Sequence, residues 1–280
     1  MKTLLHPFRS LLLSLPLILF CGCGSSSSTV DDSADWSAKV KTHLTANEAG
    51  ALVWESLEAH GGLANWLDAG TLEFRWTYSM RDMGTNAVVD TIQQIEPSTM
   101  RASAQIPDTE TRFGWDGEAA WIIPPDSKDL MVPPRFWALT PYYFVAMPFV
   151  FGDLNARFAA LPDFEFEGTT YQQVKVTYTP EAGDAPDDYY ILLIHPETKL
   201  VDACRYIVTS KLVTEQPKPE KLITMEYRKP VGDFSLPTFH RSFPMEGEEV
   251  GGQIRDALAT EYKWLPNAPD FSAPAGAKAL

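Results

Sequence analysis

The sequence is poor in cysteine, in positive charge and in long apolar runs. Only three of its 280 residues are cysteines, and 23 Lys and Arg face 37 Asp and Glu, which gives a formal net charge of −14. Because a surface of this charge repels phosphate, we expect no nucleic acid partner and no binding of anionic lipid headgroups through charge. The N-terminal apolar run, Leu11 to Phe20, has ten residues. A membrane-spanning helix needs roughly 20.

The chain also lacks the short motifs that mark common enzymes. It has no Gly-x-Ser-x-Gly elbow, no His-Glu-x-x-His and no Gly-rich phosphate loop. His60, His195 and His240 are far apart in the sequence, and we interpret each as a surface or helix-capping residue. We therefore expect no enzyme activity, no catalytic residues and no cofactor. A hydrolase without a familiar motif, built on His195, His240 and Asp188, is the competing hypothesis.

What stands at the N-terminus is a processing signal. Lys2 and Arg9 lie upstream of the apolar run, and no acidic residue precedes it, which is typical of a secretory signal that is removed. The run ends in Phe20-Cys21-Gly22-Cys23, which resembles the bacterial lipobox, in which a small residue precedes the lipidated cysteine. Phe20 departs from the pattern, which more often has Leu.

We choose Cys23 as the lipidation site because Gly22 precedes it, whereas bulky Phe20 precedes the rival Cys21. The lipobox resemblance implies palmitate-like acyl chains on the Cys23 thiol and a third chain on the new N-terminus. Two or more chains hold a protein stably at a membrane. A plain secretory signal with incidental cysteines is the alternative.

No metal site is predicted. After processing and acylation only Cys204 remains as a free thiol, which excludes a set of cysteine ligands and any intramolecular disulfide. The apolar surroundings of Cys204 in "LVDACRYIV" predict a packed thiol. Asp184, Asp187 and Asp188 in "GDAPDD" lack the ligand spacing of a calcium loop, so we interpret them as a solvated loop.

We divide the chain into a lipoprotein signal peptide (1–22), a flexible tether (23–45), one domain (46–267) and a C-terminal tail (268–280). A helix is expected at the start of the domain, with Thr45 as its N-cap, Glu48 completing a capping box, and Gly61-Gly62 ending it.

The period then changes from helical to two. In "TLEFRWTYSMRD" the residues alternate between an apolar and a polar face, which predicts a long strand with one wet side. About ten strands follow from similar patterns, mostly with short antiparallel connections, and Asp116-Gly117 marks one hairpin turn.

An aromatic segment interrupts the strands. "PPRFWALTPYYFVAMPFVFGDL" is cut by four prolines, which predict short helical pieces packed across the sheet instead of one long helix. Behind it, "NARFAALPDF" is expected to hold one more helical turn.

This order of elements resembles the LolA/LolB-like outer-membrane lipoprotein-sorting family over roughly residues 46 to 266. The resemblance is carried by "AHGGLANWLDAGTLEFRW", the aromatic segment, "HPET" and "GDFSLPT". It implies an α+β, mostly β fold: a strongly curved antiparallel sheet, an unclosed half-barrel, covered by an N-terminal helix and short aromatic helices. It also implies an apolar hollow that receives acyl chains.

The expected function is non-catalytic binding of a hydrophobic ligand, the acyl chains of a lipid or lipoprotein, in that hollow. The alternative is an envelope scaffold whose core is filled and which binds another protein. Gly24 in place of an aspartate favours an outer-membrane lipoprotein that faces the periplasm or the cell exterior. The residues expected to line the hollow are Leu72, Phe74, Trp76, Tyr78, Phe136, Trp137, Tyr142, Phe144 and Phe149.

The anchor can be tested directly. Cys23→Ser should move the protein from the membrane to the soluble fraction, because the acyl chains and not the acidic surface would hold it there. Fractionation followed by immunoblotting checks this, with Cys21→Ser as the matched control. Release by Cys21→Ser and retention by Cys23→Ser would show that the site is Cys21.

Overall fold

The computed structural model describes residues 29–80, 87–130, 132–179 and 187–280. The predicted lipidation site, Cys23, its rival Cys21, and Asp184 of the acidic loop lie outside these residues. No helix among the described residues is both long enough and apolar enough to span a bilayer.

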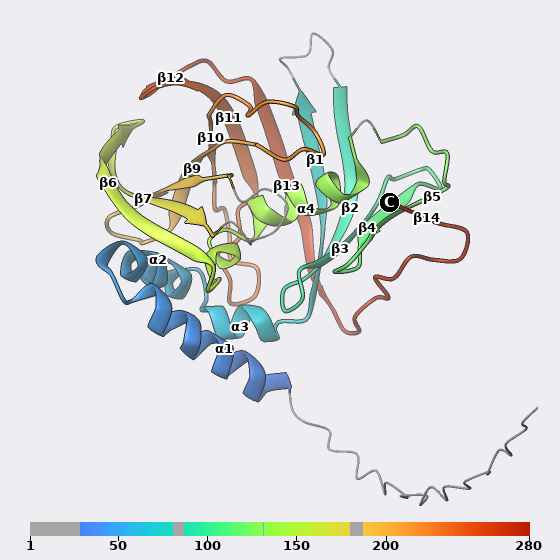
Figure 1. Ribbon diagram of the computed structural model, residues 1–280, viewed down its shortest axis with the longest axis horizontal. Helices are drawn as coiled ribbons and strands as arrows, with labels where there is room; N and C mark the ends of the chain where they lie inside the picture. Colours follow the sequence, from blue (N-terminus) through green and yellow to red (C-terminus); the bar gives the residue numbers. More distant parts are fainter. Residues whose placement is uncertain (1–28, 81–86, 131, 180–186) are drawn as a thin grey trace, which may run out of the picture.

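The largest part of the fold is one antiparallel sheet that curves without closing (Figure 1). Its strands follow the order β14-β5-β4-β3-β2-β1-β13-β11-β10-β9-β8-β7-β6, with β12 paired to β11. The expected fold class, a mostly β half-barrel with helical cover, is therefore confirmed. The strands are β1 (Thr71–Met80), β2 (Ala87–Glu96), β3 (Arg101–Gln105), β4 (Arg112–Trp115), β5 (Ala120–Ile123), β6 (Ala156–Phe166), β7 (Thr169–Tyr178), β8 (Tyr190–Ile194), β9 (Val201–Tyr206), β10 (Lys221–Thr224), β11 (Phe239–Glu246), β12 (Glu249–Val250), β13 (Arg255–Leu265) and β14 (Lys278–Ala279).

The helices cover the sheet in two groups (Figure 1). Helices α1 (Thr29–Leu44), α2 (Glu48–Ala59) and α3 (Leu63–Asp68) form a layer beside β6 and β7. Helix α4 (Pro134–Val145) lies inside the curve of the sheet and is followed by the 3-10 turn η2 (Phe149–Phe151).

Helix α1 corrects the expectation of a tether up to residue 45. Val40 and Leu44 of this helix are fully buried, and His43 bonds the carbonyl of Ala156 at 2.9 Å. The sequence of this segment suggests a tether because most of its residues are polar, and in the structure most of its described positions are exposed. Its few apolar side chains fold it onto α2 and α3, which bury them.

The N-cap of helix α2 lies two residues after Thr45, the expected N-cap. Asn47 is its N-cap, and its side chain accepts a hydrogen bond from the Gly50 amide at 2.8 Å. The Thr45 hydroxyl instead donates to the carbonyl of Lys41 at the end of α1. Thr45 and Asn47 are both suitable N-cap residues. In the structure Thr45 is still bonded to the end of α1, so Asn47 caps α2.

The long central strand β1 forms as predicted. It pairs with β2 on one side and β13 on the other over nearly its whole length. On its wet face, Arg75 binds Asp90 of β2 through two nitrogens, at 2.6 and 3.0 Å. Its other face points to the interior and is buried from Leu72 to Tyr78.

The aromatic segment forms one longer helix where short pieces were expected. Helix α4 continues through Pro141. Proline inside a helix removes one backbone hydrogen bond, here the bond to the Trp137 carbonyl, but it does not end the helix when packing holds both sides. Trp137, Tyr142, Phe144 and Val145 are all buried and supply that packing.

The helical turn expected in residues 155–164 is wrong, because these residues belong to strand β6. The segment pairs with β7 along its length, with a bulge between Leu161 and Phe164 that contains Pro162. β6 is the outermost strand of the sheet, where a proline and a bulge are tolerated because no neighbour needs the missing amide.

The part of the sheet from β11 to β6 curls so tightly that β6 and β11, the two strands at its ends, meet. Glu167, after β6, pairs with Arg241 of β11 at 2.8 and 2.9 Å, and the Phe166 and Phe243 rings lie 6.0 Å apart. This curl encloses a second, smaller apolar core on the face opposite to the main core. Its buried members are Phe164, Tyr171, Ile191, Leu193, Ala203, Leu222, Phe243 and Met245.

The C-terminal tail also packs on the sheet. Phe271 is buried, its carbonyl accepts a hydrogen bond from the Trp121 indole at 2.8 Å, and β14 pairs with β5. The tail therefore covers the edge of the sheet at β5.

The packing of α1 predicts a stability effect. Leu44→Ala should lower the free energy of unfolding by about 2–5 kcal/mol, because the leucine is fully buried and its loss leaves a cavity. Urea denaturation measures this. Leu212→Ala is the matched control: that leucine is 44% exposed, so its truncation should change stability by about 0.5 kcal/mol or less. Equal effects would show that α1 does not belong to the folded unit.

Candidate hydrophobic binding site

The structure brings all nine predicted lining residues into the main core. Leu72, Phe74, Trp76 and Tyr78 project from β1 toward the interior. Strand alternation places the four β1 side chains on one face, as the sequence indicated. Helix α4 lies inside the curve of the sheet (Figure 1), and its Trp137 contacts Tyr78. Phe149 of η2 instead stacks on Trp66 of α3 and contacts Phe234, so the structure does not bring it to the β1 side chains.

These nine side chains are shielded from solvent. Eight of the nine side chains are buried, and Phe136 is half-buried against the others. A ligand that enters between β1 and α4 must therefore displace protein side chains. In the conformation described, the arrangement matches the filled-core alternative as well as it matches a binding layer.

Ring contacts join α4 to the middle of the sheet in one chain. The Trp137 ring lies 5.4 Å from the Tyr78 ring, Tyr78 lies 6.5 Å from Trp76, and Trp76 lies 5.3 Å from His240 of β11. Phe144 of α4 meets His240 from the other side, at 6.3 Å. We call these five residues the aromatic layer. Sequence reasoning missed His240 as a member of it.

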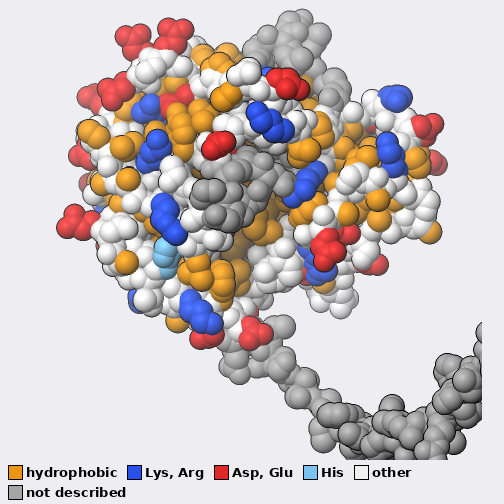
Figure 2. All heavy atoms as spheres, viewed as in Figure 1, with side chains coloured by type: hydrophobic (Ala, Val, Ile, Leu, Met, Phe, Trp, Pro, Cys, Tyr) orange, Lys and Arg blue, Asp and Glu red, His pale blue; other side chains and the backbone are white. Residues whose placement is uncertain are grey.

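Half-buried tyrosines continue the aromatic layer toward the surface. Tyr190 of β8 stacks with Tyr143 of α4 at 6.1 Å and with Tyr206 of β9 at 6.5 Å. Tyr206 in turn contacts Phe144 at 5.4 Å. Tyrosines carry flat rings that are apolar except at the hydroxyl, which suits side chains at the boundary of a core. Figure 2 shows apolar side chains around a hollow in one face of the molecule.

His240 is a core residue and not the surface or capping residue that was expected. Its side chain is fully buried, and its Nδ1 lies 3.0 Å from the carbonyl of Thr224. Because a carbonyl only accepts, Nδ1 donates, and the neutral ring carries a lone pair on Nε2. Burial lowers the pKa of His240 to about 4.

His60 is also buried, at the C-cap of α2, so the capping interpretation is confirmed for this histidine. Its Nδ1 donates to the carbonyl of Ser56 at 2.8 Å, and its Nε2 lies 3.1 Å from the Tyr227 hydroxyl. Burial lowers the pKa of His60 to about 4, although the bond to Ser56 opposes this shift. Both histidines are therefore neutral at neutral pH.

The residues of the hydrolase hypothesis are held by different partners. Asp188 accepts two hydrogen bonds from Thr209, and its half-buried position raises its pKa. His195 accepts backbone amides of the β8–β9 turn, and His240 bonds Thr224. No hydrogen bond joins any two of the three among the described residues, so nothing in their geometry resembles a nucleophile with its base.

Cys204 is the packed thiol that the sequence predicted. It is fully buried in β9, within the main core, and burial raises its pKa. A buried neutral thiol is a poor nucleophile. Within the ranges that the structure covers, no group of three acidic, His or Cys side chains is placed to hold a metal ion.

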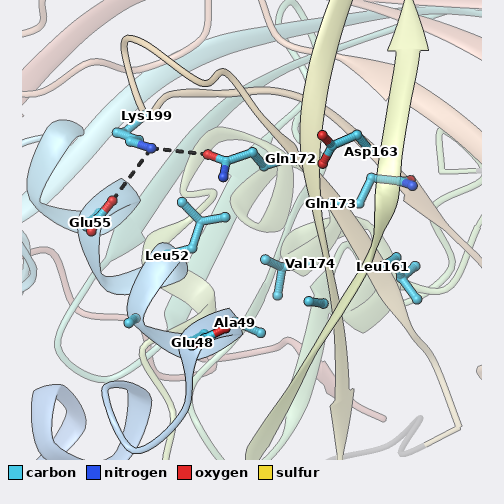
Figure 3. Close-up of a pocket in the computed structure, with 12 residues that line it drawn as sticks. Glu48, Ala49, Leu52, Glu55, Leu161, Asp163, Gln172, Gln173, Val174 and Lys199 are labelled. Atoms are coloured by element: carbon cyan, nitrogen blue, oxygen red, sulfur yellow. Dashed lines mark hydrogen bonds and ion pairs between the residues drawn. The ribbon is translucent and has the colours of Figure 1, made fainter.

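A separate recess of about 450 Å³ lies between α2 and strands β6 and β7 (Figure 3). Leu52, Leu161 and Val174 give it an apolar wall. Lys199 bridges its rim, bonding Gln172 at 3.1 Å and pairing with Glu55 at 3.7 Å. None of the nine predicted residues lines it, so it is not the hollow that the sequence indicated.

No protein-family model matches this sequence, and no curated protein matches it. Solved structures do match. A domain described as an outer membrane lipoprotein-sorting protein, from Vibrio parahaemolyticus, aligns with a TM-score of 0.51 at 10% identity over 79% of this chain and 94% of that chain. A LolA superfamily protein from Nitrosomonas europaea aligns with a TM-score of 0.50 at 9% identity over 79% and 95%. The chain therefore has the LolA/LolB-like fold, and the resemblance is confirmed at the level of fold.

The buried histidines predict acid sensitivity. Their pKa of about 4 in the folded chain lies below the ordinary 6.5, so between these values the unfolded chain binds more protons. Stability should therefore fall as the pH falls through this window, by up to about 3 kcal/mol for each histidine.

His240→Phe should remove about half of this dependence. Urea unfolding at a series of pH values between 7 and 4.5 measures the slope. His195→Gln, at the β8–β9 turn, is the control and should keep the slope of the unmodified protein. A His240→Phe slope equal to that of the control would show that His240 is not held neutral by burial.

Proposed function

We propose that the protein is a lipid-anchored carrier or receptor in the bacterial envelope that binds an apolar chain between β1 and α4, without chemical catalysis. The confirmed fold supports this proposal, since one solved protein that shares it is described as lipoprotein-sorting. The observation that carries it is the aromatic layer: flat rings from α4 and from the sheet meet along one interface, which an acyl chain could occupy by parting them.

Helix α4 is suited to move because its own hydrogen bonds do little to fix it. Pro141 removes one backbone bond from its interior, and no side chain among the described residues caps its N-terminus. Its contacts anchor it mainly to one arm of the sheet, β3 to β5, where Arg135 stacks on Trp115 at 3.6 Å. Displacing its other end would open the layer while that anchor holds.

The remaining parts of the proposal concern location. Acyl chains on Cys23 would hold the protein at the outer membrane, on the periplasmic or the exterior side. Helix α1 begins at Thr29, only a few residues after Cys23, so the folded domain would sit close to the bilayer surface. A bound chain would then have a short path between the membrane and the aromatic layer.

An envelope scaffold is the second candidate function. The burial of eight of the nine candidate residues favours it, because a filled core needs no ligand. In that case the recess beside α2, or another surface, would bind a protein partner. The two functions differ in whether an apolar probe enters the aromatic layer.

A binding experiment separates them. The full chain carrying Cys23→Ser, which we expect to be soluble, is titrated with a pyrene-labelled hydrocarbon chain, and the fluorescence is followed. Phe136→Glu should weaken binding at least about tenfold. Phe136 is half-buried against the main core, next to Trp137 in α4, and a carboxylate there disfavours apolar contact. Thermal melting confirms that this variant is folded.

The control is Val88→Glu, which places the same charge on a side chain that is 54% exposed and outside the layer. It should bind the probe like the parent protein. Absence of probe binding by the folded parent protein, with no lipid co-purifying in native mass spectrometry of the anchored form, would favour the scaffold.

A further inference from the structure

The aromatic layer contains polar atoms that no described residue satisfies. The indole Nε1 of Trp76, the indole Nε1 of Trp137 and the imidazole Nε2 of His240 are all buried, and none has a hydrogen-bond partner among the described residues. Each such atom destabilises the fold compared with one that is paired. Unsatisfied buried groups of this kind are rare in folded proteins.

These three atoms belong to one continuous structure. Trp76 touches His240 directly, and Tyr78 joins Trp76 to Trp137, all within ring-centroid distances of 6.5 Å or less. Trp76 and His240 come from the sheet, whereas Trp137 comes from α4. The unsatisfied atoms are therefore distributed over both sides of the interface at which a ligand is proposed to enter.

A fourth atom extends the set on the sheet. Gln93 is buried in β2, beside Phe74 in the sheet register. Its Nε2 donates to the Thr91 hydroxyl at 2.8 Å, and that hydroxyl donates to the Trp76 carbonyl. The Gln93 Oε1 has no partner among the described residues. The interior thus offers two N–H donors and two acceptors.

We propose that the aromatic layer contains a subsite for the uncharged polar head of an acyl ligand, one that carries a carbonyl oxygen and a hydroxyl or amide N–H next to its chain. This inference rests on the proposed function. The carbonyl oxygen accepts from the indole N–H of Trp76 or of Trp137. The hydroxyl or N–H donates to Nε2 of His240 or to Oε1 of Gln93.

The donor–acceptor balance selects against other head groups. A hydrocarbon end would leave all four atoms unpaired. A phosphate or carboxylate would accept from the indoles but would bring negative charge against the lone pair of His240 and the oxygen of Gln93. An acyl ester with a free hydroxyl, or an N-acyl amide, satisfies both kinds of atom.

The test uses the Cys23→Ser full chain loaded with the pyrene-labelled hydrocarbon. Competitors of equal chain length are a monoacylglycerol, an N-acyl amino acid amide, an alkyl phosphate and an unsubstituted alkane. We expect at least one of the two neutral polar ligands to displace the probe at a concentration about tenfold lower than the alkane or the phosphate. Stronger competition by the monoacylglycerol would indicate a lipid as the source of the ligand. Stronger competition by the N-acyl amino acid amide would indicate an acylated protein.

Three variants test the assignment of atoms. Trp76→Phe and His240→Phe should abolish the tenfold preference and change alkane binding by about twofold or less, since each keeps a ring and loses one polar atom. Trp264→Phe, which removes an indole N–H outside the layer, is the matched control and should keep the preference.

The unfolding free energy of the ligand-free variants provides a second readout. Trp66 is as buried as Trp76, but its indole bonds Tyr142. Both Trp→Phe changes leave a similar cavity, so if the nitrogen of Trp76 is unpaired in the free protein, Trp76→Phe should cost less stability than Trp66→Phe. An equal loss of stability with an unchanged preference would mean that the atom is paired by internal water and has no role in binding, and would overturn the inference. Probe binding without any head-group preference would overturn it as well and leave the proposed function intact. No probe binding at all would remove both.

Discussion

Burial of the apolar face of β1 is the constraint on which the rest of the structure depends. An isolated β1 would expose Phe74, Trp76 and Tyr78 together, and burying each large side chain contributes about 1.5–3 kcal/mol. The sheet curves around this face, and α4 helps to bury it by lying inside the curve, although Pro141 weakens the helix. An apolar ligand would replace the ring contacts of Trp137 and Phe144 with the sheet, whereas the contacts with β3 to β5 keep α4 anchored.

The sequence predicted what depends on local pattern and missed what depends on contacts between distant segments. Period-two alternation identified β1 and the buried side of it correctly, and the flanking turns identified most hairpins. Helix α1 was missed because its stability comes from Val40 and Leu44 packing on other helices. Residues 155–164 were read as helical because alanines favour helix, whereas pairing with β7 decides their conformation.

The candidate site shows the same division. Its nine apolar members could be chosen from the strand face and the aromatic segment, because hydrophobic side chains in regular elements must be buried somewhere. His240 could not be chosen, since nothing in "LPTFHRSF" distinguishes a solvated histidine from one enclosed by Trp76 and Phe144. Only the curvature that brings β11 beside β1 through β13 gives that histidine its surroundings.

An apolar core normally excludes polar atoms or pairs them, and several polar side chains buried outside the aromatic layer are paired. His60 is buried as deeply as His240, yet both of its ring nitrogens have partners. Arg205, in the second core, is paired with Glu220 at 2.6 Å and with a backbone carbonyl. Unpaired buried atoms also occur elsewhere among the described residues, for example at Ser56 and Gln173, but the ring nitrogens of Trp76, Trp137 and His240 lie together where α4 meets the sheet. A filled core that served only stability would gain by replacing these residues with Phe or Leu, because apolar rings of similar size lose nothing by being unpaired. Their presence at the one interface that a ligand would open is the physical reason to prefer a binding layer to a scaffold.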